Sequence, residues 1–108
     1  MTEPTTALVA LTELAPVIRS KNAGPTLLTL DLFFRDAQAF ERAASSPALQ
    51  ADAVAHLYRC PAQAVQRFAL PGMGAIKFTL PRRVCAGSPG DGDVYGAQQH
   101  GPLLEVWL

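Results

Sequence analysis

Hydrophobic and polar residues alternate most regularly between residues 27 and 34. Leu28, Leu30, Leu32 and Phe34 occupy one side of this pattern, and Asp31 is among the residues on the other side. A period of two residues is typical of a β-strand with one buried face. We therefore predict the central strand of the fold here.

The segment before this strand permits two interpretations. Four apolar residues have the i, i+3, i+4, i+7 spacing of a helix, with Thr12 placed to cap it and residues 22–24 placed to end it. These apolar residues are Leu11, Leu14, Ala15 and Ile18. Pro16 opposes a regular helix because proline has no backbone N–H. A strand over residues 8–15 is the alternative prediction.

Two helices and a hairpin are predicted after the central strand. Asp36 is placed to cap the first helix, and Pro61 follows the end of the second. Strands over residues 64–70 and 75–80 then flank a turn of proline and glycine residues. This arrangement predicts a β-hairpin.

The last part of the chain is rich in glycine and proline. Residues 81–102 hold 8 of the 17 Gly and Pro residues, which predicts a long loop. Long loops in small domains are often functional. Asp93 is placed to cap a short helix over residues 94–99, and Leu104, Val106 and Leu108 alternate as a last strand.

Without the opening element, the predicted order of elements is βαββαβ. This order predicts an α+β fold, namely a ferredoxin-like two-layer sandwich whose antiparallel sheet is covered by helices on one face. Residues 1–7 are polar, so we predict a disordered N-terminal segment. Residues 8–108 are predicted to form a single domain with an extra N-terminal element.

Composition narrows the class of protein. The chain has 108 residues, a net charge of zero and 49% hydrophobic residues, which are typical of one soluble globular domain. Because there is no excess of cations, we expect no nucleic-acid or membrane partner.

Cys60 and Cys85 have no metal-ligand spacing and are interpreted as reduced thiols, so no metal site is predicted. We expect a cytoplasmic protein.

A first polar cluster precedes the central strand. Arg19, Ser20, Lys21 and Asn22 combine two cations with a hydroxyl and an amide, a set that suits a carboxylate, a phosphate or the anionic end of a coenzyme A ester. We take these four residues as candidate substrate-binding residues. The alternative is a helix C-terminus, where cations are favoured and residues 22–24 form the cap.

A second polar cluster lies in the glycine-rich segment 87–100. Its candidate catalytic residues are Asp91, Asp93, Tyr95 and His100, which have the side chains needed for proton transfer. Its candidate substrate-binding residues are Ser88, Gln98 and Gln99. No known nucleotide-binding loop is present, and the cofactor is unknown. The alternative is an exposed turn followed by a solvated helix end.

These segments resemble a known family. Residues 17–25, 28–31, 75–81 and 87–100 resemble the domain of unknown function 4387 family. That family is more remotely similar to the small C-terminal ferredoxin-like domain of acyclic terpene utilisation (AtuA-type) proteins, in which an Arg-Ser-Gly-Asp-Lys-Gly loop takes the place of residues 19–24. Here the acidic residue is missing and Asn22 follows the lysine, so a role for that acid does not transfer.

The resemblance implies a larger AtuA-type partner and a role in the catabolism of carboxylic acids or their CoA esters, with hydratase or lyase chemistry. We therefore expect a small accessory subunit in a hetero-oligomer that contributes one or both polar clusters to a shared site. A structural assembly module and a stand-alone small-molecule-binding protein are the alternatives.

Overall fold

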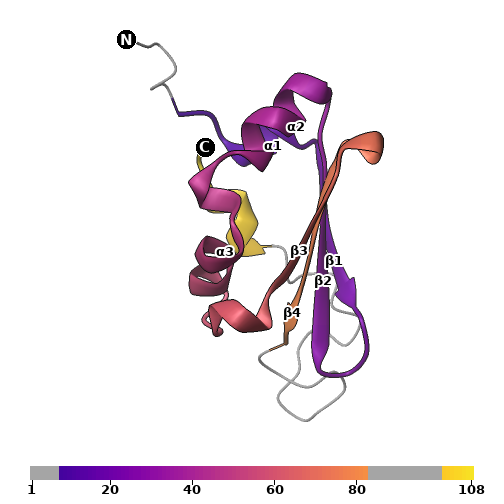
Figure 1. Cartoon of the computed structure of the whole chain (residues 1–108), viewed down its shortest axis with the longest axis vertical. Helices are drawn as coiled ribbons and strands as arrows, with labels where there is room; N and C mark the ends of the chain where they lie inside the picture. Colours follow the sequence, from indigo (N-terminus) through magenta and orange to yellow (C-terminus); the bar gives the residue numbers. More distant parts are fainter. Residues whose placement is uncertain (1–7, 83–100) are drawn as a thin grey trace.

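The computed structural model of the chain describes residues 8–82 and 101–108 (Figure 1). In these ranges the helices are α1 (Leu11–Leu14), α2 (Ala37–Ala44) and α3 (Ala51–Leu57). The strands are β1 (Val17–Asn22), β2 (Leu27–Phe33), β3 (Gln66–Leu70) and β4 (Ala75–Pro81). Short 3-10 turns are η2 (Pro47–Leu49), η3 (Ala62–Ala64), η4 (Pro71–Met73) and η5 (Gly101–Glu105).

The four strands form one antiparallel sheet in the order β1-β2-β4-β3. Two hairpins, β1–β2 and β3–β4, join side by side through β2 and β4. Figure 1 shows that the three labelled helices lie on one side of this sheet. The predicted α+β class, consistent with a ferredoxin-like two-layer sandwich, is confirmed.

The hydrophobic core lies between the helices and the inner face of the two central strands. Both β2 and β4 point every second residue at the helices, as the period-2 pattern predicted. These buried residues are Leu28, Leu30, Leu32, Ile76, Phe78 and Leu80. Phe40 and Ala43 of α2 and Val54 of α3 pack against them. The apolar side chains on the inner face of the sheet therefore form part of the hydrophobic core.

Several local predictions are confirmed. The strand at residues 27–33 and the hairpin of β3 and β4 lie where the pattern placed them. The Asp36 carboxylate caps α2 by accepting a hydrogen bond of 2.7 Å from the backbone N–H of Ala39. Gly74 closes the hairpin turn with a positive φ of 61°, which glycine adopts without strain.

The opening segment differs from both interpretations of its sequence. The helix is confined to Leu11–Leu14, has Ala10 rather than Thr12 at its N-cap, and ends before Pro16. Residues 17–22 then form the edge strand β1 instead of continuing a helix. Asn22 is the last residue of that strand, and Gly24, with φ of 104°, allows the turn into β2.

The predicted last strand is wrong. Residues 101–105 form the 3-10 turn η5, and Trp107 makes only an isolated bridge to Ala10. Leu103 is fully buried whereas Leu104 is exposed, so the buried position does not follow the predicted alternation. The fourth strand of the sheet is therefore β1, and the element order is not βαββαβ. The predicted helix at residues 94–99 lies outside the described residues.

Candidate functional site

The first polar cluster lies in strand β1, where alternation divides it between the two faces of the sheet. Arg19 and Lys21 pair in register with Asp31 and Thr29 of β2, on the face opposite the helices. Ser20 pairs with Leu30 and therefore faces the helices, as does Asn22. The structure thus brings the two cations together but separates them from the hydroxyl and the amide.

We call the face opposite the helices the outer sheet face. Its residues form three rows across the four strands, because paired residues share a face. The ionic row is Arg19, Asp31, Lys77 and Phe68. The apolar row on one side is Val17, Phe33, Ala75 and Leu70. The polar row on the other side is Lys21, Thr29, Thr79 and Gln66.

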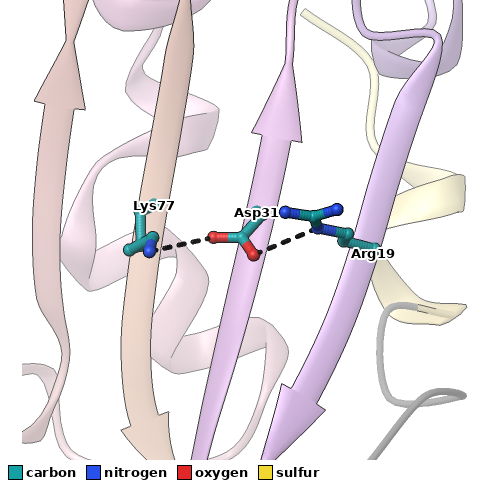
Figure 2. Close-up of polar contacts among 3 residues, drawn as sticks. All are labelled: Arg19, Asp31 and Lys77. Atoms are coloured by element: carbon teal, nitrogen blue, oxygen red, sulfur yellow. Dashed lines mark hydrogen bonds and ion pairs between the residues drawn. The ribbon is translucent and has the colours of Figure 1, made fainter. Parts of the chain in front are cut away.

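The ionic row holds a buried carboxylate between two cations (Figure 2). Arg19 donates from Nε to Oδ2 of Asp31 at 3.3 Å, and Nζ of Lys77 lies 3.6 Å from Oδ1. The Asp31 side chain is only 3% exposed, whereas those of Arg19 and Lys77 are 58% and 41% exposed. A buried carboxylate requires such compensation because desolvation of the charge is costly.

Arg19 is held from a second direction by an aromatic ring. The guanidinium carbon lies 4.9 Å from the centroid of the Phe33 ring, within the range of a cation–π contact. Only Nε of this guanidinium is joined to Asp31 in Figure 2. The terminal nitrogens of a guanidinium suit a planar oxyanion, which arginine binds in a bidentate way.

A second polar contact lies at the other end of β1. Arg82 donates from Nη1 to Oδ1 of Asn22 at 2.9 Å, and its backbone N–H donates to the oxygen of Thr26 at 2.8 Å. Arg82 is only 7% exposed, so its side chain is shielded from solvent. This contact ties the β1–β2 turn to the end of β4 and gives Asn22 a structural partner.

The remaining predicted site residues lie outside the described part of the chain. They are Ser88, Asp91, Asp93, Tyr95, Gln98, Gln99 and His100. Their roles stay predictions, as does the convergence of the second polar cluster with the first.

Sequence reasoning missed three residues of the outer sheet face. Asp31 was interpreted only as one of the residues on the other side of an alternating strand. Lys77 and Phe33 were not identified as candidates. One signal was present for Asp31, since Asp31 and Lys21 are the only charged residues among residues 20–34. The pairing of Lys77 with Asp31 depends on the register of β2 and β4, which the sequence alone does not give.

Tyr58, Cys60 and Arg67 have shifted pKa values and lie on the helix side of the molecule. Burial raises the pKa of the Tyr58 hydroxyl and of the Cys60 thiol. Cys60 is a free thiol. Burial also lowers the pKa of Arg67, which donates to the backbone oxygens of Leu49 and Ala44 at 2.8 and 2.9 Å. Arg67 thereby ties β3 to the segment between α2 and α3.

Two features are absent from residues 8–82 and 101–108. No group of three or more His, Cys, Asp or Glu residues in these ranges is placed to hold a metal ion. No helix among the same residues is long and apolar enough to cross a membrane.

Comparison with known proteins gave one match. A family model described as Domain of unknown function (DUF4387) matches residues 11–107. Neither the curated proteins nor the solved structures gave a match.

Proposed function

We propose that this chain, which belongs to the DUF4387 family of domains of unknown function, is a small accessory subunit that supplies an anion-binding surface to a larger protein. The ligand in this proposal is a carboxylic acid or its CoA ester, and the larger protein is of the AtuA type. The remote similarity of the first polar cluster to the Arg-Ser-Gly-Asp-Lys-Gly loop of those proteins supports this choice of partner.

The observation that carries the proposal is the fixed orientation of Arg19. Asp31 accepts from its Nε, and Phe33 lies against its guanidinium plane. Such a side chain loses little further conformational entropy when it binds an oxyanion. Lys21 and Lys77 lie on the same face, so this face carries three cations for one carboxylate.

The outer sheet face is suited to binding rather than to proton transfer. Its carboxylate, Asp31, is already paired with both neighbouring cations and is shielded from solvent. A general base must reach the proton that it removes. The proton-transfer groups of a hydratase or lyase reaction would therefore come from Asp91, Asp93, Tyr95 or His100, or from the larger protein.

A second candidate function, a structural assembly module, is favoured by a different observation. Val17, Leu27 and Phe68 are large apolar residues on the outer sheet face, and each is more than 40% exposed. A partner that covered this face would remove all three apolar side chains from water. In this alternative the cations serve only to orient the partner.

The experiment is an affinity pull-down of the chain from its native extract, followed by mass spectrometry and an assay of the complex on CoA esters of carboxylic acids. The test variant is Arg19→Gln, and the conservative variant is Arg19→Lys. Arg59→Gln is the matched control, because Arg59 is an exposed arginine that follows α3, away from the outer sheet face.

The proposal expects stoichiometric recovery of one larger protein and loss of activity in Arg19→Gln with the complex intact. Arg19→Lys should keep part of the activity, because it keeps the charge but not the bidentate geometry. Loss of assembly in Arg19→Gln would favour the assembly module. Recovery of the chain alone would contradict both and favour a stand-alone small-molecule-binding protein.

A further inference from the structure

Strand β3 lies at one edge of the sheet, and β4 is the only strand that it pairs with among the described residues. Gln66, Phe68 and Ala69 of this strand are exposed. Ala69 pairs with Ile76 and faces the helices, so its exposure shows that the helical layer does not reach this edge. An edge strand presents a row of backbone N–H and C=O groups that another strand can bind. The edge of β3 is therefore accessible to a further strand.

The side chains of β3 do not block pairing at this edge. Proteins usually protect an edge strand with exposed lysines, other charges or proline. Strand β3 holds one charged residue, Arg67, and no proline. The Arg67 guanidinium donates to the backbone oxygens of Leu49 and Ala44 at 2.8 and 2.9 Å, so it is bound within its own chain. The central side chain of the strand is Phe68, which is 45% exposed.

Strand β1, at the opposite edge of the sheet, carries the charges that β3 lacks. Arg19 and Lys21 are both exposed and lie on the same face of that strand. If two copies of the chain paired through β1, the four cations would lie on one face of the joined sheets and repel each other. Electrostatics therefore favours a second copy at the edge of β3 and opposes one at the edge of β1.

We propose that β3 pairs antiparallel with β3 of a second copy of the chain, so that two four-stranded sheets form one continuous sheet in a symmetric dimer. A twofold axis at Phe68, the middle residue of β3, pairs all five residues of the strand. Phe68 then lies opposite Phe68 of the second copy, and Gln66 lies opposite Leu70. Arg67 lies opposite Ala69, whose small side chain leaves room for it. This register places an aromatic pair at the centre of the contact and no like charges directly opposite each other.

The dimer should be weak, because the paired strands are short. Protein interfaces that bury less than about 1,200 Å² are typical of transient association. We therefore expect a dissociation constant on the order of 100 µM. The dimer leaves β1 at both ends of the continuous sheet and does not use Arg19. It is therefore independent of the proposed function, and it is tested on the chain alone, without a larger protein.

The test is sedimentation equilibrium of the purified full chain at concentrations from about 10 µM to about 1 mM, which span the expected dissociation constant. The proposal expects a monomer–dimer equilibrium in this range. Amide hydrogen exchange at the two limits locates the contact, because residues 66–70 should exchange more slowly at the higher concentration and residues 17–22 should not change. A monomer at every concentration would overturn the proposal, as would slower exchange of residues 17–22 in place of residues 66–70.

Phe68→Lys places a charge at the centre of the contact, opposite the same charge of the second copy. It should raise the dissociation constant at least about tenfold, because it replaces an apolar pair by like charges. Val17→Lys is the matched control, since Val17 is 47% exposed and lies on the same face at the other edge of the sheet. It should leave the dissociation constant unchanged.

An unchanged dissociation constant in Phe68→Lys, or an equal rise in both variants, would overturn the proposal. Far-UV circular dichroism checks that both variants fold. The exchange measurement on the unsubstituted chain tests the proposal without either variant.

Discussion

The two faces of strand β2 have different physical tasks. On the inner face Leu28, Leu30 and Leu32 are completely shielded from solvent by the helices. On the outer sheet face the same strand carries Asp31 between two half-exposed cations. Apolar burial contributes about 25 cal/mol per Å², whereas ion pairs whose cations are half-exposed to solvent contribute little, about 1 kcal/mol each. The inner face therefore stabilises the fold, and the outer face is available for recognition.

The largest loss of stability is expected from Leu30→Ala. Leu30 is fully buried in the middle of the sheet, and its truncation removes apolar burial and leaves a cavity. We expect the free energy of unfolding, measured by urea denaturation, to fall by about 2–5 kcal/mol. Leu27→Ala is the control on the same strand, because Leu27 is 41% exposed, and should cost less than about 1 kcal/mol. Similar losses in the two variants would remove the distinction between the faces.

An intermediate loss is expected from Asp31→Asn. The amide keeps the shape of the side chain but cannot form a charge-assisted contact with Arg19 or Lys77. We expect the free energy of unfolding to fall by about 1–2 kcal/mol. Charge-assisted contacts stabilise more than neutral ones, but Arg19 and Lys77 are half-exposed and remain hydrated, which limits the loss. Urea denaturation checks this, with Glu41→Gln on the exposed side of α2 as the control. A loss as large as that of Leu30→Ala would show that the ionic row stabilises the fold as the core does.

Alkaline pH should lower the stability of the fold through Tyr58, on the helix side of the molecule. Burial raises the pKa of Tyr58 above its ordinary value of 10.0. Above about pH 10 the unfolded chain therefore loses the Tyr58 proton while the folded chain keeps it. The folded state then binds more protons than the unfolded state, so stability falls as pH rises.

Tyr58→Phe should make this fall smaller between pH 9 and 11, measured by urea denaturation at each pH. Stability at pH 7 in the same variant is the reference, since Tyr58 is protonated in both states there. An unchanged slope in Tyr58→Phe would show that this hydroxyl is not shielded in the folded state.

The parts of the fold that the sequence predicted are those with a local cause. Strand β2 has a strict period of two, Asp36 caps its own helix, and Gly74 supports a positive φ. Strand β1 was missed because the spacing of Leu11 to Ile18 imitates a helical stripe. The structure shows that this spacing spans a short helix, Pro16 and the start of an edge strand. Its pairing with β2 is a tertiary contact that no local pattern encodes.

The candidate site was predictable to a similar extent. Arg19 and Lys21 stand out as cations near a turn, and the structure keeps both on one face. Ser20 and Asn22 are adjacent in sequence but face the helices, because a strand reverses the direction of each successive side chain. Asp31 and Lys77 join Arg19 only through the register of three strands. The ionic row could therefore be predicted only if residues 17–22 were first assigned to a strand paired with β2.

The smallest change in stability is expected from Arg19→Gln, although this residue has the largest role in the proposed function. Its side chain is 58% exposed, so its ion pair and its contact with Phe33 are each worth less than about 1 kcal/mol. A double-mutant cycle of Arg19→Gln with Asp31→Asn, measured by urea denaturation, should give a coupling energy below about 1 kcal/mol. This coupling should decrease further at high salt, because screening acts on the exposed partner. A larger, salt-independent coupling would mean that Arg19 stabilises the fold, so that its replacement would destabilise the protein as well as alter the outer sheet face.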